Sequence, residues 1–225
     1  MEFIKEKYKE LGSTNDTAKI KAAHGAPEGT VIIAESQTAG RGRLDHKFYS
    51  PAGGLYMSLI LRPPFPDFTP ITAAAAVAVC RAIASLGFDA RIKWVNDIYV
   101  AGRKVCGILT EADVTAGWAV LGIGVNTVCP GKDAPPVAGW LFDGGCDNDR
   151  IADLILNEFG RLYETIPGKD FIGYYREKSC LIGHRVTADG REYDCVGIAD
   201  DLSLILSDGG EVRRITCGEV SVKPV

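Results

Sequence analysis

The stretch Glu35-Ser-Gln-Thr-Ala-Gly-Arg-Gly-Arg43 follows directly on a β-branched run, Thr30-Val-Ile-Ile-Ala34. The run is short and apolar, which indicates a buried strand, and the glycines and arginines after it are typical of a loop at the strand's end. The two glycines allow backbone N–H groups to come close to a ligand. Arg41 and Arg43 are permanent cations whose planar forks suit phosphate or carboxylate. The stretch therefore predicts a loop that closes over an anion, with the rest of the chain forming the pocket.

The same composition also suits a solvated basic turn, and the motif alone leaves both interpretations open. It is not a Walker loop, because no Gly-Lys-Ser/Thr follows, and it is not a dinucleotide fingerprint, because the third glycine and the helix after it are missing. The choice between the two therefore depends on polar residues elsewhere in the chain.

Length and composition bound the class of protein. The chain has 225 residues, which suffices for one substantial domain and a small module. Apolar residues make up 46% of the chain, so we expect a packed core rather than general disorder. The formal net charge of −4 argues against a protein that binds nucleic acid through its overall charge. Any function that depends on positive charge must therefore rest on a local cluster of basic residues.

The cysteines and the N-terminus bear on the compartment. Seven cysteines occur without a Cys-x-x-Cys pair or a zinc-like Cys/His spacing. Cys80, Cys106 and Cys195 lie in apolar surroundings and are interpreted as small buried side chains, which suits a reducing compartment. The first residues contain no signal-peptide core, and no apolar run reaches membrane-spanning length. We expect a cytoplasmic protein without a membrane partner.

A helix is expected from Leu11 to Ala23. Several N-cap candidates precede it, and Gly25 and a following proline end it. Ser13 and Thr14 have two interpretations: they cap the helix, or the helix N-terminus with its hydroxyls holds a small polar ligand such as a carbonyl or carboxylate. Both can hold at once.

The remaining pattern predicts an α+β part at residues 1–178 and a small all-β barrel or meander at 179–225. In the first part we expect a helix capped by Thr69 and one capped by Asp149. The expected elements are strands at 55–62, 91–100, 104–112 and 118–125, helices at 70–86, 151–165 and 170–178, and short strands at 185–187, 192–198, 202–207 and 212–216.

Four polar or aromatic positions have competing interpretations. Lys93 is either an exposed residue of an edge strand or a half-buried cation that needs an anionic partner. Asn96 and Asp97 are turn formers or metal–phosphate contacts. Phe48 is a core anchor or a ring that stacks on a planar base.

The strand at 118–125 carries the clearest single signal. Gly122 and Gly124 lie two residues apart and so face one side of the strand. Because glycine weakens a strand interior, this pair indicates that another backbone or a ligand approaches there.

Seven short motifs occur in a fixed order along the chain. They are Gly12-Ser-Thr-Asn15, Gln37-x-x-Gly-Arg-Gly-Arg43, Ser50-Pro-x-Gly-Gly54, Lys93-Trp-x-Asn-Asp97, Lys104-x-x-Gly-Ile-Leu109, Gly122-x-Gly-x-Asn126 and Gly218-Glu-Val220. Each is weak alone, but the ordered set covers nearly the whole chain and resembles the biotin–protein ligases (holocarboxylase synthetases). The resemblance implies a catalytic α+β domain related to the class II aminoacyl-tRNA synthetases, followed by an SH3-like barrel.

The resemblance implies ATP-dependent chemistry in two steps. Biotin carboxylate attacks the α-phosphate of Mg-ATP to give biotinyl-5′-AMP, and a lysine of a biotin carboxyl carrier domain then displaces AMP. The first step joins two anions, so cations are needed where charge develops. A closed loop keeps water from the activated acyl group. The expected ligands are biotin and ATP, with Mg²⁺ carried by ATP rather than held by protein ligands.

The same resemblance assigns roles to individual residues. Arg41 and Arg43 are implied to be catalytic by closing over phosphate and carboxylate, and Lys93 by bridging the reacting groups. Biotin contacts are implied for Ser13, Thr14, Gln37, Gly40, Arg41, Lys93, Gly107 and Gly122. Nucleotide contacts are implied for Asn15, Arg41, Arg43, Phe48, Asn96 and Asn126.

Three positions depart from the usual family pattern. Val95 replaces the usual proline, Phe48 replaces a common tryptophan, and a glycine usual in the last barrel falls at Asp201 or Leu202. Only a dozen residues precede Ser13, so we expect neither the winged helix-turn-helix of many bacterial relatives nor DNA binding or repression. By analogy a homodimer through the apolar segment 114–121 is possible. We also predict that residues 38–48 are not ordered without ligand.

Two rival classes remain open. A lipoate or octanoate transferase shares the fold and a pocket lysine, but those families favour an adjacent His-Asp, and here His46 is not followed by Asp. A non-catalytic protein, either a biotin sensor or a nucleic-acid binder, is disfavoured by Lys93, Arg41 and Arg43 together and by the negative net charge.

Overall fold

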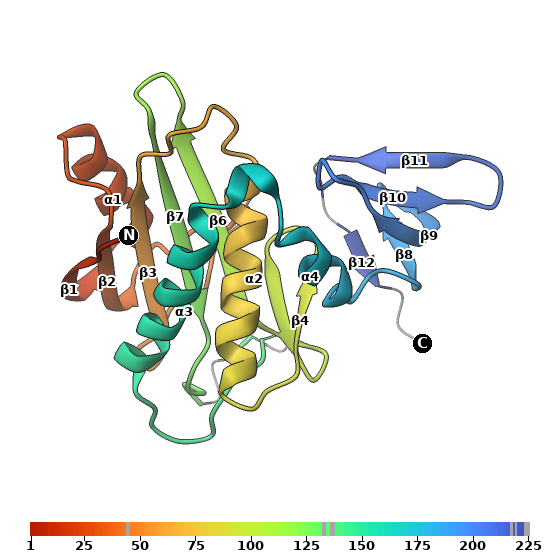
Figure 1. The fold of residues 1–225 in the computed structure, drawn as a ribbon. Helices are drawn as coiled ribbons and strands as arrows, with labels where there is room; N and C mark the ends of the chain where they lie inside the picture. Colours follow the sequence, from red (N-terminus) through yellow and green to blue (C-terminus); the bar gives the residue numbers. More distant parts are fainter. Residues whose placement is uncertain (44–45, 132–133, 136–137, 217, 219, 223–225) are drawn as a thin grey trace.

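The computed structural model describes residues 1–43, 46–131, 134–135, 138–216, 218 and 220–222. Its larger part is a seven-stranded sheet in the order β1-β2-β3-β7-β6-β5-β4 (Figure 1). Its strands are β1 (Ile4–Leu11), β2 (Thr30–Gln37), β3 (Leu55–Leu61), β4 (Ala90–Lys93), β5 (Asp97–Val100), β6 (Arg103–Asp113) and β7 (Trp118–Val125). β1 and β2 run parallel, and the other neighbouring pairs run antiparallel.

Helices cover both faces of this sheet. α2 (Pro70–Ser85) and α3 (Asn148–Tyr163) lie side by side over one face (Figure 1). The alanine-rich body of α2 is fully buried there, because small side chains let the helix approach the strands closely. α1 (Thr14–Ala23) covers part of the opposite face, where Ala18 and Ala22 pack on Val120 and its neighbours.

The alternation along β7 positions the functional site. Ala119, Leu121 and Ile123 point into the core beneath α2 and α3. Val120 points the other way, under α1, and Gly122 and Gly124 continue its face, with Gly122 beneath Asn15 in the first turn of α1 and Gly124 beyond it. The side of the sheet that α1 leaves uncovered is thus lined by glycine, as the sequence pattern indicated.

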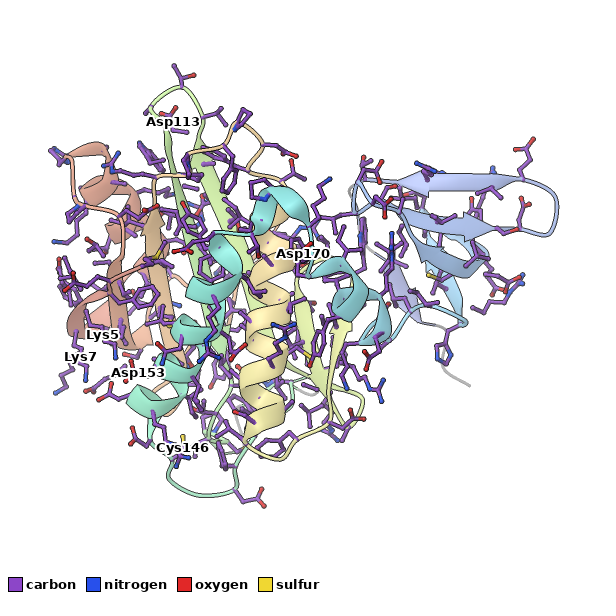
Figure 2. The ribbon with its side chains drawn as sticks, viewed as in Figure 1. Lys5, Lys7, Asp113, Cys146, Asp153 and Asp170 are labelled. Atoms are coloured by element: carbon purple, nitrogen blue, oxygen red, sulfur yellow. The ribbon has the colours of Figure 1, made fainter. Side chains whose placement is uncertain are left out.

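β1 was not predicted, and it corrects the expected helix at 11–23. The strand reads Ile-Lys-Glu-Lys-Tyr-Lys-Glu-Leu and includes Leu11, so α1 begins only at Thr14, with Ser13 as its N-cap. Lys5 pairs with Asp153 on α3 (Figure 2). β1 is hard to predict from the sequence because its charged residues leave no apolar run, as is usual for a polar strand at a sheet edge.

The expected single strand at 91–100 is wrong. The chain turns at 94–96 and comes back on itself, so β4 and β5 form a hairpin with Lys93 opposite Asp97. One expected cap is wrong, because the N-cap of α3 is Asp147, which accepts from the Arg150 N–H, rather than Asp149. Thr69 does stand at the N-cap of α2 before Pro70, as expected, but its side chain makes no cap bond.

The C-terminal part is a five-stranded antiparallel sheet in the order β11-β10-β9-β8-β12. It follows the short helix α4 (Ile172–Glu177) and matches the expected run of short strands. Its strands are β8 (Arg185–Ala188), β9 (Arg191–Ile198), β10 (Leu204–Ser207), β11 (Val212–Ile215) and β12 (Val220–Val222). The α+β class is therefore confirmed, while the boundary after 178 stays a prediction.

The C-terminal sheet is fastened to the larger one through Trp94. The buried indole Nε1 of Trp94 donates to the carbonyl oxygen of Leu202 at 2.8 Å. Leu202 has φ of 68°, a left-handed conformation that favours glycine. Of the two candidate positions for the missing family glycine, Leu202 is therefore the one with the matching backbone.

Two further expectations can be compared with the structure. Cys80, Cys106 and Cys195 are buried, as expected, and burial raises the pKa of the Cys80 thiol to about 11. The segment 114–121 is exposed at residues 114–117 and buried at residues 119–121, where it belongs to β7, so the homodimer through it stays a prediction. Among the described helices, none combines the length and the apolar character needed to cross a membrane.

Candidate active site

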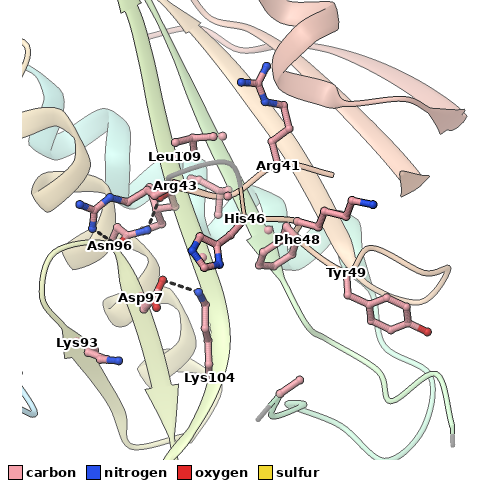
Figure 3. Close-up of a pocket in the computed structure, with 18 of the residues that line it drawn as sticks. Arg41, Arg43, His46, Phe48, Tyr49, Lys93, Asn96, Asp97, Lys104 and Leu109 are labelled. Carbon is pink, nitrogen blue, oxygen red and sulfur yellow. Dashed lines mark hydrogen bonds and ion pairs between the residues drawn. The ribbon is translucent and has the colours of Figure 1, made fainter. Parts of the chain in front are cut away.

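A cavity of about 600 Å³ opens on the sheet face that α1 leaves uncovered (Figure 3). Its walls come from parts of the chain that are distant in sequence: the start of α1, the loop after β2, the turn between β4 and β5, residues near Trp140, and the ends of β8 and β12. The size is typical of a small-molecule site. The loop that the sequence singled out thus does border a pocket.

Ser13 and Thr14 form one end of the cavity. Ser13 Oγ accepts from the Asp16 N–H at 3.4 Å, so the capping interpretation holds. The Thr14 N–H and hydroxyl both donate to Gln37 Oε1, at 2.8 and 3.0 Å. Gln37 Nε2 donates in turn to Ser50 Oγ at 2.9 Å. Gln37 does not line the cavity; it fixes Thr14 from behind.

Asn15 extends this polar floor across the sheet. Ser58 on β3 is fully buried, and its hydroxyl lies within hydrogen-bond distance of Thr14 Oγ1 (2.8 Å) and Asn15 Oδ1 (2.6 Å). Asn15 Nδ2 donates to Glu111 on β6 at 2.8 Å. A Cβ on Gly122 would stand 2.1 Å from Asn15 Oδ1, so this glycine makes room for the asparagine.

The middle of the cavity floor is bare backbone covered by an aromatic ring. Gly107 on β6 and Gly124 on β7 are directly paired. A Cβ on Gly124 would lie 2.5 Å from the Phe48 ring, and one on Gly107 would lie 2.9 Å from it. Phe48 also meets Tyr56 edge to face. The pair of glycines therefore seats Phe48, a contact that the sequence pattern did not identify.

Arg43 joins the loop to two other walls of the cavity. Its guanidinium donates to Asn96 Oδ1 at 3.2 Å and to the Gly218 carbonyl oxygen at 3.4 Å. Asn96 Nδ2 donates to the Ile108 carbonyl at 2.8 Å, which fixes the amide. Asn96 is thus a partner of Arg43 and of the backbone of β6.

Arg41 points away from this group (Figure 3). Its guanidinium donates to Asp16 Oδ1 on α1 at 3.0 Å. Gly40 does not line the cavity, because its Cα faces the Phe48 carbonyl and Ser50 Oγ. The prediction about the order of 38–48 without ligand includes Leu44 and Asp45, and the last motif includes Glu219; these three lie outside the described residues.

Two lysines border the cavity. Lys104 Nζ lies 2.7 Å from Asp97 Oδ1, an ion pair marked by a dashed line in Figure 3. The Cε atom of Lys104 lies 3.4 Å from where a Gly107 Cβ would be, so the lysine side chain crosses the glycine floor of the cavity. Lys93 is half-buried, and its ammonium lies 5.6 Å from the centre of the Tyr99 ring, a cation–π distance. Burial raises the pKa of Tyr99 to about 12.

Asn126 closes the far end of the site. It is buried, lines the cavity, and donates through Nδ2 to the Lys104 carbonyl at 3.3 Å. Its backbone N–H donates to the Val105 carbonyl. The amide is therefore fixed beside the base of Lys104.

The structure brings together in one cavity most of the site residues that the resemblance implied. Those that line it are Ser13, Thr14, Asn15, Arg41, Arg43, Phe48, Lys93, Asn96, Gly107, Gly122 and Asn126. Gln37 and Gly40 support it from behind. The sequence argument missed Lys104, Ser58 and Glu111, and it named Asp97 only as a turn former or a metal–phosphate contact. Lys104 opens a quoted motif, which was a usable signal, whereas the roles of Ser58 and Glu111 depend on contacts with residues distant in sequence.

The family follows from comparison with known proteins. Residues 9–126, just over half of the chain, match the model of the biotin/lipoate A/B protein ligase family. This segment carries the polar floor, the loop after β2, Lys93 and Lys104, and the paired glycines Gly107 and Gly124.

The chain belongs to this family.

Individual relatives agree with the assignment. The "Biotin--[acetyl-CoA-carboxylase] ligase" of Mycobacterium tuberculosis is 34% identical over 94% of this chain and 86% of its own length. The "Bifunctional ligase/repressor BirA" of Bacillus spizizenii is 45% identical over 56% of this chain. The match covers only 41% of that relative and of the Bacillus subtilis protein.

Solved structures support the fold. A biotin protein ligase from Aquifex aeolicus, in complex with biotin and ATP, superposes with a TM-score of 0.85 at 24% identity and covers 98% of this chain and 99% of its own. A biotin protein ligase from Leishmania major, in complex with biotinyl-5-AMP, has a TM-score of 0.63 at 22% identity and covers 95% of this chain and 98% of its own. Both the large sheet and the C-terminal sheet therefore have counterparts in this family.

Proposed function

We propose that the protein is an ATP-dependent biotin–protein ligase, which attaches biotin to a lysine of a biotin carboxyl carrier domain through biotinyl-5′-AMP. The observation that carries the proposal is the layout of the cavity. A buried, neutral hydroxyl–amide floor lies at one end, and the cations Arg43 and Lys104 lie beyond a glycine-seated aromatic ring. Such a cavity suits a ligand with a polar head and a distant anionic group.

The polar floor fits the ureido head of biotin. Ser13 and Thr14 are only 4% exposed, and the network behind them fixes their orientation. In the part of the chain that the structure describes, Ser13 Oγ accepts one long bond, so its O–H remains able to donate to a carbonyl oxygen. We propose Ser13, Thr14 and Gln37 as the biotin-head group, with Gln37 acting through Thr14.

The cationic end fits the reacting anions. Lys104 pairs with Asp97 through an ion contact and crosses the glycine floor, whereas the Lys93 ammonium rests over Tyr99. We propose that Lys104, rather than Lys93, bridges carboxylate and phosphate, and that Arg43 contacts the phosphates. Phe48 then offers a ring face to the purine, and Asn126 lies beside the adenosine.

The first step forms one bond and breaks one. A carboxylate oxygen of biotin attacks the α-phosphorus of ATP, the bond from that phosphorus to the bridging oxygen breaks, and pyrophosphate leaves. Arg43 and Lys104 stabilise the negative charge that accumulates between the two anions, and they hold the reacting atoms in line. No proton transfer is needed.

The second step transfers the acyl group. The amine of an acceptor lysine attacks the carbonyl carbon of biotinyl-5′-AMP, the carbon–oxygen bond to phosphate breaks, and AMP leaves while the amine loses a proton. Until the acceptor arrives, the loop has to keep water from the mixed anhydride. We propose that the sheet at 179–225 helps to close the cavity, because Thr187, Asp189 and Gly218 line it.

The main rival within the family is transfer of lipoate or octanoate. The floor argues against it, since buried groups built to hydrogen-bond a polar head reject an apolar chain that leaves them unpaired. The cations Arg43 and Lys104 argue against a sensor that binds biotin without catalysing a reaction.

The test is transfer to an acceptor domain. The protein is incubated with biotin, Mg-ATP and a carrier domain, and the acceptor mass is measured, with Arg43→Ala alongside. We expect one biotin per acceptor with the parent and a loss of about 100-fold or more in rate with the variant. Tight biotin binding without biotinyl-5′-AMP would establish the sensor instead, and transfer of lipoate or octanoate alone would establish the rival transferase.

A further inference from the structure

Four charged side chains form a closed ring beside the cavity mouth. Asp16 Oδ1 lies 3.0 Å from Arg41 Nη1 and 2.9 Å from Lys19 Nζ. Glu111 Oε1 lies 2.8 Å from Lys19 Nζ and 3.7 Å from Arg41 Nη2. The signs alternate around this charged ring (Asp16, Lys19, Glu111 and Arg41), so each member has an opposite charge on both sides. It joins α1, β6 and the loop after β2.

The charged ring is tied to the floor of the cavity. Glu111 uses its two oxygens separately: Oε1 meets Lys19, and Oε2 accepts from Asn15 at 2.8 Å. Asn15 lines the cavity and is held by Ser58. The backbone joins the same region, because the Ala39 N–H donates to the Gly12 carbonyl at 2.8 Å.

The protonation of the ring agrees with its geometry. Burial opposes ionisation of Glu111, but hydrogen bonds from Lys19 and Asn15 and the charges of Lys19 and Arg41 outweigh it and lower its pKa. For Asp16 too, burial is outweighed by the hydrogen bond from Lys19 and by the charges of Lys19 and Arg41, so its pKa is lowered. All four groups are therefore charged at neutral pH.

We propose that Asp16 and Glu111 are positioning residues that clasp Arg41, so that Arg41 fastens the loop to α1 and β6 instead of contacting the reacting anions. The guanidinium of Arg41 is turned away from Arg43 (Figure 3), and it lies against the carboxylates of Asp16 and Glu111. The structural part of this proposal stands by itself, and its catalytic consequence rests on the proposed ligase function. A loosened clasp lets water reach the acyl adenylate.

The first experiment measures the loop directly. Amide hydrogen exchange of residues 39–42 is followed in the ligand-free parent and in Asp16→Asn and Glu111→Gln. The matched control is Glu6→Gln, which removes the ion pair between Glu6 on β1 and Lys21 on α1, at 3.0 Å. This pair involves the same helix and has similar exposure, but it lies away from the loop. We expect exchange to rise about threefold to fivefold in the two clasp variants, the size that loss of a surface ion pair permits, and not in the control.

The second experiment measures leakage of the intermediate. AMP released is compared with biotin attached, and the ratio should be near one for the parent, rise at least twofold in Asp16→Asn, and return toward one in Asp16→Glu. A merely structural role would lower rate and yield together without changing the ratio. Loop exchange equal to that of Glu6→Gln would overturn the clasp whatever the activity. Faster exchange in the two clasp variants, together with a parent that makes no biotinyl-5′-AMP, would leave the clasp standing and overturn the ligase proposal.

Discussion

The floor of the cavity and the loop above it are built in opposite ways. The floor consists of neutral groups, Thr14, Asn15 and Ser58, which are almost fully buried and stand on a helix and a strand. The loop reaches its neighbours through Arg41 and Arg43, which are partly exposed and bind carboxylate, amide and carbonyl oxygens on other elements.

The difference follows from what each part can rearrange. A buried neutral group that loses its partner stays unsatisfied, so the floor has one stable arrangement and serves recognition. An exposed cation can exchange one oxygen partner for water or for another anion at little cost. The loop is therefore able to respond to a ligand while the floor holds it.

The largest effect separates the two lysines at the charged end. Lys104→Ala should lower the rate of biotinyl-5′-AMP formation about 100- to 1,000-fold, because it removes a cation from the place where charge develops. Lys93→Ala should lower it about tenfold or less, since the Lys93 ammonium rests over Tyr99. The rates are measured by pyrophosphate release, with thermal unfolding as the control for folding. A greater loss in Lys93→Ala would return the bridging role to Lys93.

The second prediction disturbs the floor through the backbone. Gly122→Ala places a methyl group 2.1 Å from Asn15 Oδ1, so it should lower the free energy of unfolding by about 1–3 kcal/mol and weaken biotin binding. Gly197→Ala on β9 is the matched control, because its new Cβ would lie 3.8 Å from the nearest side-chain atom. Denaturant unfolding and calorimetric titration with biotin measure the two effects. An unchanged affinity in Gly122→Ala would mean that the floor is not the biotin site.

The third prediction disturbs the floor from behind. Gln37→Ala leaves the Thr14 N–H without its acceptor, so we expect a loss of about 1–2 kcal/mol in stability and a higher KM for biotin at similar kcat. Gln37→Glu keeps that acceptor and should have a smaller effect on KM. Equal effects of the two variants would show that acceptance from Thr14 is not what matters.

The smallest effect concerns the pH dependence of the stability that the charged ring contributes. Asp16 and Glu111 have lowered pKa values, so the stability that they contribute is fully present above their ordinary values of 3.8 and 4.5 and is lost as pH falls through the lowered values. The small Tm difference between the parent and Asp16→Asn should therefore persist from pH 7 to pH 5 and shrink steadily as the pH falls below 3.8. A difference that does not shrink in acid would mean that the pairing with Lys19 and Arg41 is not its source.

Local patterns predicted much of the scaffold. The strand at 118–125 and the helix that begins at Pro70 were found because an apolar strand and a capped, apolar helix are both visible within one window. β1 was missed because its charged alternation is stabilised by pairing with β2 and by contacts with α3. The hairpin of β4 and β5 was missed because Trp94-Val-Asn96 has no glycine to mark a turn.

By itself, the sequence determined the order of the motifs, the family that they resemble, and the glycine face of β7, because these depend on residue types at short spacings. Only the tertiary structure decided which lysine crosses the glycine floor and where Arg41 is held. Asp16, Arg41 and Glu111 are far apart along the chain, and their contact arises because α1, the loop and β6 meet at one corner of the sheet. The interaction between two charges depends on their distance in space and not on their spacing in the sequence. The ion pairs of Arg41 can therefore be identified only in the folded protein.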